Sequence, residues 1–200
     1  MQQIYTLTGD SVWLDRSVEV TEFVMTHYYD RDSSRFWYSW ENPSPNIERR
    51  TDHFDNAMPS GNSVMAHNLL RGSIYVGRSE WKHLAEKMLI QMLTAIDRYP
   101  TSFANWAIAL QDTGFGYSEL GVVGASYSEQ IKEIMQTFLP GLIVVGADIN
   151  HTETIPLLKD RLGEKESTSF FVCRDFQCEL PVFSIEEALS LLGKRQSSEK

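Results

Sequence analysis

Hydrophobic residues recur at helical spacing through the first 115 positions of the chain. Apolar residues three or four positions apart predict amphipathic helices, each with one face turned toward a core. The segments that show this period are 11–30, 63–77, 79–99 and 101–114. The most regular stripe lies in 79–99, at Leu84, Met88, Leu89, Met92, Leu93 and Ile96. The N-terminal part is therefore predicted to be built from helices.

Short signals mark where these helices begin and end. Asp10 is expected to cap the first helix and Ser79 the third, because both side chains accept hydrogen bonds from exposed backbone N–H groups. Gly114 is expected to end the fourth, because glycine readily adopts the left-handed conformation that follows helices. Between the first two helices, a strand is predicted from the bulky residues Phe36, Trp37, Tyr38 and Trp40.

A weak internal repeat relates two parts of the helical region. Ile4-Tyr5 is followed by a short turn and Trp13, and Ile74-Tyr75 is followed by a similar turn and Trp81. Each copy is typical of one helix ending and the next beginning. Repeated helical hairpins build α/α solenoids or closed α/α toroids. Because the chain opens in the last turns of a helix, it is expected to be a fragment of a longer polypeptide.

From about Gly116 the pattern changes to short, continuously apolar runs. Runs at 118–125, 141–148 and 169–175 predict strands, and segments 128–138 and 184–193 predict helices, with a short helix at 152–162 and a frayed tail at 194–200. A strand, a helix and a second strand, with both strands apolar throughout, indicate a parallel pair. The predicted fold is mainly α, with helical hairpins at 1–115 and a small α/β unit with parallel strands at 116–200.

Charge and composition exclude several classes of function. The 200 residues carry a net charge of −9, whereas general nucleic-acid binding requires clustered Lys and Arg. Negative charge also disfavours an anionic membrane surface, and no apolar run reaches the roughly 20 residues of a membrane span. The N-terminus has no basic stretch followed by an apolar one, so no signal peptide is predicted and a cytoplasmic location is expected.

The richest polar cluster lies at 49–63, just before the second helical segment. Asp52 and Asp55, three residues apart, are candidates for an acid and a base acting on a sugar, and His53 for assisting proton transfer. The candidate ligand contacts are Arg50, Asn56, Ser60, Asn62 and Trp37. The alternative is a solvated, salt-bridged loop that feeds a helix capped by Ser60 or Asn62.

Three other features have both a chemical and a structural interpretation. Ser63 and His67 are four residues apart and so share a helix face, but this spacing alone does not activate a serine nucleophile. The Val-Val-Gly turns at 122–124 and 144–146 resemble nucleotide-binding turns, yet they lack the complete glycine pattern and favour simple strand-to-helix turns. Cys173 and Cys178 favour two thiols beside a strand, with a disulfide as the open alternative.

Two motifs carry a resemblance to a known family. Residues 55–63 read DNAMPSGNS, and 173–178 read CRDFQC, followed by a proline and a helix. Together with the aromatic FWYSW before them and SFANWAIALQD between them, these motifs resemble thioredoxin-domain-containing proteins of the spermatogenesis-associated protein 20 type. The resemblance runs in order along nearly the whole chain. It implies an N-terminal thioredoxin-like domain in the parent chain, a toroid similar to N-acylglucosamine 2-epimerases and six-hairpin glycosidases, and a small α/β tail.

In such a toroid, helix N-termini and their loops surround the mouth of a central funnel. The resemblance therefore implies that Asp55, Asn56, Ser60 and Asn62 face a pocket for a sugar-like ligand. No cofactor is expected, and no metal site, because no histidine pair has metal-ligand spacing. The alternative function is a non-catalytic helical scaffold that presents a surface to a partner protein. Because part of a toroid leaves apolar helix faces uncovered, self-association of the chain is also expected.

Overall fold

The computed structural model describes residues 1–40, 48–150, 155–161, 167–174 and 177–197, with side chains described up to 193. The chain forms two compact units. The sheet unit comprises Met1–Leu14, Ile74–Gly77 and Gly116–Lys200, and the helical unit comprises Asp15–Ser73 and Arg78–Phe115. None of the helices in the described ranges is long and apolar enough to cross a membrane.

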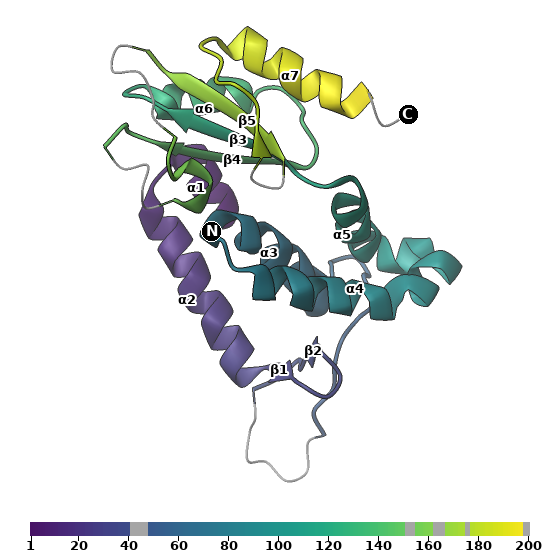
Figure 1. Cartoon of the computed structure of the whole chain (residues 1–200). Helices are drawn as coiled ribbons and strands as arrows, with labels where there is room; N and C mark the ends of the chain where they lie inside the picture. The colour runs from purple at the N-terminus through teal and green to yellow at the C-terminus, as the bar shows by residue number, and fades with distance from the viewer. Residues whose placement is uncertain (41–47, 151–154, 162–166, 175–176, 198–200) are drawn as a thin grey trace. The chain divides into compact units, whose positions relative to one another are not determined.

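Helices make up most of the described structure (Figure 1). The α-helices are α1 Gln2–Thr8, α2 Ser11–His27, α3 Gly61–Val76, α4 Ser79–Arg98, α5 Ala104–Phe115, α6 Tyr127–Ile134 and α7 Ile185–Ser197. Two 3-10 helices are η1 Pro100–Phe103 and η3 Pro156–Leu158. The strands are β1 Tyr29–Asp30, β2 Arg35–Phe36, β3 Ser118–Val123, β4 Leu142–Ala147, β5 Ser169–Arg174 and β6 Gln177–Cys178.

The sheet unit holds a mixed four-stranded sheet in the order β4-β3-β5-β6. Strands β3 and β4 run parallel, with Leu120 opposite Val144, which confirms the predicted parallel pair. Strand β5 runs antiparallel to β3, and β6 runs antiparallel to β5. The third predicted strand therefore turns a parallel pair into a mixed sheet.

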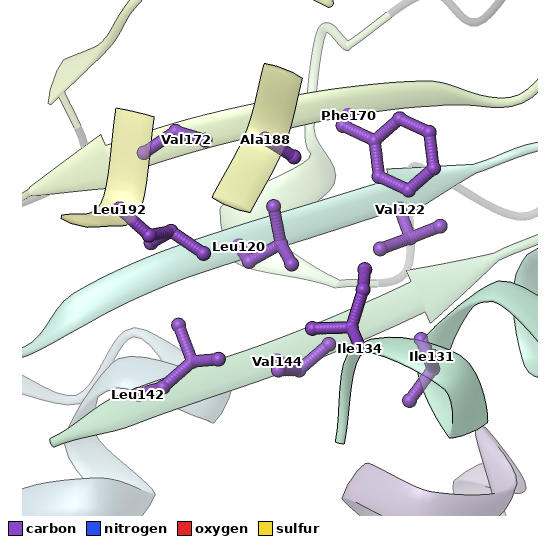
Figure 2. Packing of buried hydrophobic residues seen from close by; sticks show 10 residues of the cluster. All are labelled: Leu120, Val122, Ile131, Ile134, Leu142, Val144, Phe170, Val172, Ala188 and Leu192. Atoms are coloured by element: carbon purple, nitrogen blue, oxygen red, sulfur yellow. The ribbon is translucent and has the colours of Figure 1, made fainter. Parts of the chain in front are cut away.

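One face of this sheet and two helices form the core of the unit. Figure 2 shows side chains of β3, β4 and β5 meeting side chains of α6 and α7. The members of this cluster are Leu120, Val122, Ile131, Ile134, Leu142, Val144, Phe170, Val172, Ala188 and Leu192. Each large aliphatic side chain buried in this way stabilises the fold by about 1.5–3 kcal/mol. The alternate residues of β3 point to the opposite face, where a Cβ on Gly121 would lie 2.6 Å from Leu158 of η3.

Glycines at the carboxyl ends of β3 and β4 allow close packing within the unit. Gly124 has φ 156°, and a Cβ there would lie 2.9 Å from Thr168 Cα. A Cβ on Gly146 would lie 2.5 Å from Ile131 and 2.6 Å from Tyr127. Protein atoms thus pack closely against each glycine. This geometry supports the structural interpretation of the two Val-Val-Gly turns.

The two cysteines form a disulfide, so the favoured prediction of two thiols is wrong. Cys173 of β5 lies directly opposite Cys178 of β6 in the antiparallel register, with the two Cα atoms 3.9 Å apart. Cys173 is fully buried. The bond joins the short strand β6 to β5. The spacing of the two cysteines in the sequence allowed this disulfide without requiring it.

Helix boundaries confirm some predicted signals and correct others. The Asp10 carboxylate accepts a hydrogen bond from the Val12 N–H at 3.0 Å, as expected for a cap. Ser79 is the first residue of α4 and not its cap, so this prediction is wrong. Arg78 occupies the cap position, and its side chain forms no capping hydrogen bond. Helix α5 continues past Gly114 and ends before Gly116, which has φ 76°. In α4, the predicted core residue Leu93 is 42% exposed.

Other segments are shorter or longer than their patterns predict. Helix α2 ends at His27 instead of residue 30, and only Arg35–Phe36 of the aromatic run forms a strand. Within 155–161 the predicted short helix is reduced to η3, and 152–154 and 162 lie outside the described residues. Helix α7 extends to Ser197, through part of the predicted frayed tail, and the rest of that tail also lies outside the described residues.

The weak sequence repeat corresponds to two similar helix–turn–helix units. Gly9 directly follows α1 and Gly77 directly follows α3, and both glycines have φ 67°. In each copy the next helix begins within two residues. A glycine in the left-handed conformation explains why each helix ends there, because other residues adopt a positive φ only with steric strain.

Candidate functional site

Asp55 lies at the centre of a buried polar network in the helical unit. Its Oδ1 accepts hydrogen bonds from the Ser60 N–H at 2.9 Å and from the Ser63 hydroxyl at 2.6 Å. Its Oδ2 accepts from the backbone N–H groups of Asn105 at 2.9 Å and Trp106 at 3.2 Å. One carboxylate therefore receives four protein donors. We call this arrangement the Asp55 tie.

The Asp55 tie joins the N-termini of two helices that are far apart in sequence. Ser60 and Ser63 begin α3, whereas Asn105 and Trp106 begin α5. Free backbone N–H groups and the helix dipole make each of these ends electropositive, so an anion between them stabilises both. Asp55 is only 7% exposed, and a carboxylate at that depth requires this number of partners. Ser60 adds its predicted cap, with its Oγ accepting from the Ser63 N–H at 3.1 Å.

Ser63 and His67 do not form the pair that a serine nucleophile requires. The Ser63 hydroxyl donates to Asp55, while His67 Nε2 lies 2.9 Å from the Asn105 carbonyl oxygen. His67 Nδ1 lies 4.0 Å from the Asp112 carboxylate. The histidine thus contacts α5, and the Ser63 hydroxyl bonds to Asp55 instead of to His67. The structure gives no support to a nucleophilic serine here.

Asn62 binds the backbone of two segments next to the start of α3. Its Oδ1 accepts from the Phe36 N–H at 2.8 Å, and its Nδ2 donates to the Phe36 carbonyl at 2.9 Å. Nδ2 also donates to the Asp52 carbonyl at 2.9 Å. Asn62 is 3% exposed, so these bonds satisfy its amide group in place of water. Its primary role in this geometry is to position the segments that carry Phe36 and Asp52.

A pocket of about 350 Å³ opens beside Asn62. Its volume falls in the range of about 300–1,000 Å³ that is usual for small-molecule sites. The lining residues come from α2 and the residue after it, from β2 and the residues after it, from the segment before α3, and from α3 itself. They are Val24, Tyr28, Phe36, Trp37, Tyr38, Asp52, Gly61, Asn62, Val64, Met65 and Asn68. Four aromatic rings among them give the pocket a largely apolar wall with a few polar groups.

The predicted site residues divide into three groups in the structure. Trp37, Asp52 and Asn62 line the pocket. Asp55 and Ser60 are buried in the Asp55 tie and do not belong to the lining.

The remaining three predicted residues lie near the pocket lining in the chain without belonging to it. Asn56 is exposed in a tight turn, with its N–H donating to the Met58 carbonyl at 3.1 Å. Arg50 is exposed and His53 half-buried. The polar cluster is therefore not one surface. Within the described ranges, no three His, Cys, Asp or Glu side chains gather as a metal site would require.

His53 is half-buried beside the segment that joins the pocket and the Asp55 tie. Neither ring nitrogen has a hydrogen-bond partner among the described residues. Burial, followed by the nearby charge of Arg35, lowers the pKa of His53 below its ordinary value of 6.5, and Asp52 opposes this shift. Its backbone carbonyl accepts from the Trp106 indole N–H at 2.9 Å. His53 is therefore mainly neutral at neutral pH.

The lowered pKa of His53 predicts the direction of one pH effect on stability. The unfolded chain takes up a proton near pH 6.5, while folded His53 does so only at lower pH. The free energy of unfolding should therefore fall as pH drops below about 6.5 and level off below the folded pKa. Urea denaturation from pH 8 to pH 5 measures this slope. His53→Gln should reduce the slope, whereas Arg35→Gln should retain most of it because burial is the larger cause. An unchanged slope in His53→Gln would contradict this account.

Comparison with known proteins shows relatives that match nearly the whole chain. Spermatogenesis-associated protein 20 from Homo sapiens is 22% identical over a 198-residue alignment that covers 94% of this chain and 25% of the relative. The chain is a distant homologue of this protein. An uncharacterised protein from Caenorhabditis elegans is 23% identical over 197 residues, covering 96% of this chain and 27% of its own length. The Mus musculus form of spermatogenesis-associated protein 20 is 20% identical over 198 residues.

These relatives confirm the family resemblance at the level of distant homology. The chain spans about a quarter of the length of the curated relatives it matches. No family model matches the chain. The names of the relatives state no substrate or reaction, so an assignment of function depends on the pocket and the residues around it.

Proposed function

We propose that the pocket of the helical unit binds a sugar-like ring. The observation that carries this proposal is the combination of four aromatic rings with Asp52 and Asn68 in a single concavity of about 350 Å³, whose walls Asn62 positions. The apolar face of a pyranose packs on aromatic rings, while its hydroxyls hydrogen-bond to a few fixed polar groups. An apolar wall with sparse polar groups is the usual composition of small-molecule sites.

Within this proposal the predicted residues take different roles. Trp37 supplies a ring face, and Asp52 supplies a hydrogen-bond acceptor. The Asp52 carboxylate receives one long bond, from the Phe54 N–H at 3.3 Å, and its second oxygen has no donor among the described residues. Asp52 is thus the best candidate for an acid or base at a bound sugar. Asp55 has four donors already and serves to hold the helices.

The distant homology and the repeated helical hairpins support a place for this pocket in a larger α/α architecture. In that arrangement the helical unit contributes hairpins to a toroid related to sugar-processing enzymes, and the parent chain carries a thioredoxin-like domain. Sugar epimerase or glycosidase chemistry is the class of activity that such a toroid suggests, by analogy of fold alone.

A glycine at the pocket provides the sharpest test of sugar binding. A Cβ added at Gly61 meets no atom within 4 Å, and the same is true at Gly114. Gly61 lines the pocket, whereas Gly114 lies in α5 outside the lining. Gly61→Leu should lower affinity for glucose or N-acetylglucosamine at least tenfold, while Gly114→Leu should bind like the unmodified chain. Isothermal titration calorimetry measures both.

The same pair of variants controls for folding. Replacing a glycine in a helix at an unstrained position is neutral or stabilising by up to about 1 kcal/mol, so neither leucine should unfold the chain. If neither sugar binds the unmodified chain, or if both leucine variants lose affinity equally, the sugar proposal is wrong.

A second candidate function, a scaffold for protein contacts, is favoured by apolar side chains left on the surface of α4. Ile90 is 67% exposed and Leu93 is 42% exposed, one helical turn apart. We expect a second copy of the chain to cover them, since exposed apolar surface drives association. Sedimentation across a concentration series should show a dimer that Ile90→Lys with Leu93→Lys dissociates. Thr94→Lys, which adds charge without removing apolar surface, should remain dimeric. A monomer at every concentration would refute self-association, and the scaffold would then require a different partner protein.

A further inference from the structure

Two arginines lie over aromatic rings of the pocket wall. The Arg49 guanidinium carbon is 4.9 Å from the centre of the Trp37 ring, and that of Arg50 is 5.3 Å from the Tyr38 ring. Both rings line the pocket. A guanidinium at this distance is attracted to the electron-rich ring face, which holds the cation beside the pocket. The two adjacent residues thus bring two positive charges to one wall.

Both arginines keep donors that the described residues do not use. Arg49 Nη2 reaches the backbone carbonyls of His27 and Ser39, each at 3.4 Å, while its buried Nε has no acceptor within the described ranges. Arg50 is exposed and forms no salt bridge with any described carboxylate. A guanidinium has five N–H donors, so several remain for a ligand.

The local balance of charge differs from that of the whole chain. The chain has a net charge of −9, yet Arg49 and Arg50 hold two guanidinium groups over rings of the pocket lining. Asp52 lines the pocket, and Asp30 is bonded to the Ser33 hydroxyl at 2.6 Å. Two guanidinium groups beside a cavity whose lining, among the described residues, has Asp52 as its acidic residue favour an anionic ligand.

We propose, resting on sugar binding at this pocket, that the ligand is an anionic sugar whose phosphate or carboxylate is bound by Arg50 and Arg49. The planar guanidinium fork matches the oxygens of both groups, and such charge-assisted hydrogen bonds are about twice as strong as neutral ones. The aromatic rings then contact the sugar ring, while the arginines select for its charge. This division of roles explains why the two guanidinium groups lie over Trp37 and Tyr38, two rings of the pocket wall.

Calorimetric titration with glucose 6-phosphate, glucuronate and glucose tests the proposal and separates the two anionic groups. At least one charged sugar should bind tenfold or more tightly than glucose, and added salt should reduce this advantage. Arg50→Gln should remove most of the advantage, lowering affinity for the charged sugar at least tenfold more than affinity for glucose. Arg98→Gln is the matched control, because Arg98 lies 5.4 Å from the Tyr99 ring, outside the pocket lining, and its loss should have no effect.

The outcomes distinguish this inference from the proposed function. If glucose binds as tightly as both charged sugars, or if Arg50→Gln and Arg98→Gln have equal effects, the anionic ligand is wrong while sugar binding stands. If inorganic phosphate alone binds as tightly as glucose 6-phosphate, the site recognises an anion without a sugar ring, and the inference is again overturned. If no sugar binds at all, both proposals fail.

Discussion

Replacing Asp55 with asparagine should destabilise the helical unit by about 4 kcal/mol. Two buried donors would lose their acceptor, at a cost of roughly 1–3 kcal/mol each, and the remaining hydrogen bonds would lose the strength that the negative charge gives them. The carboxylate accepts four hydrogen bonds at 2.6–3.2 Å, from α3 on one oxygen and from α5 on the other. An asparagine amide would point its own N–H groups at donors on one of these sides. Urea denaturation followed by tryptophan fluorescence should show a midpoint clearly below that of the unmodified chain.

Asp52→Asn is the matched control for this substitution. Asp52 is three residues away and only half-buried, and its carboxylate receives one bond of 3.3 Å from the described residues. Its amide variant should change stability by less than about 1 kcal/mol. If the two variants are equally stable and only Asp55→Asn loses sugar binding or activity, Asp55 is a functional acid and the structural role argued for it is wrong.

Replacing Asn62 with alanine should destabilise the helical unit by about 3 kcal/mol, because three buried backbone groups lose their only side-chain partner. These groups are the Phe36 N–H, the Phe36 carbonyl and the Asp52 carbonyl. Asn62→Asp should cost more than Asn62→Ala, because a carboxylate retains the bond to the Phe36 N–H but faces two carbonyl oxygens. Chemical denaturation of the two variants gives this order directly.

The exposed Asn56 provides the control for Asn62. Its side chain lies on the surface, so Asn56→Ala should change stability by no more than about 0.5 kcal/mol. A small effect of Asn62→Ala, or an aspartate variant more stable than the alanine variant, would show that the amide does not hold the pocket walls as described.

Local sequence patterns predicted most of the regular structure. The apolar stripe at 79–99 corresponds to α4, Ser79–Arg98, and the two continuous apolar runs correspond to the parallel strands β3 and β4. These elements follow from periodicity because each buries a continuous face or run of its own residues. The aromatic run did not form a strand beyond Phe36, because its backbone bonds pass to different segments: the Trp37 N–H donates to the Tyr28 carbonyl and the Tyr38 N–H to the Arg50 carbonyl.

The features that the sequence did not predict depend on contacts between residues far apart in the chain. Asp55 was identified as important, but its partners Asn105 and Trp106 follow it by 50 and 51 residues, and no local pattern links them. The pocket residues Tyr28, just after α2, and Met65 of α3 were missed for the same reason, since only the fold determines how these segments pack. The disulfide likewise depends on the register of β5 and β6.

Two tryptophan indole N–H signals report separately on the pocket and on the Asp55 tie. Trp37 lines the pocket, and Trp106 begins α5, with its indole N–H bonded to the His53 carbonyl at 2.9 Å. In a nuclear magnetic resonance titration with glucose 6-phosphate, the Trp37 indole signal should shift with saturation while the Trp106 signal stays in place. A shift confined to Trp106, or no shift at either ring, would contradict a ligand site in the pocket beside a purely structural Asp55 tie.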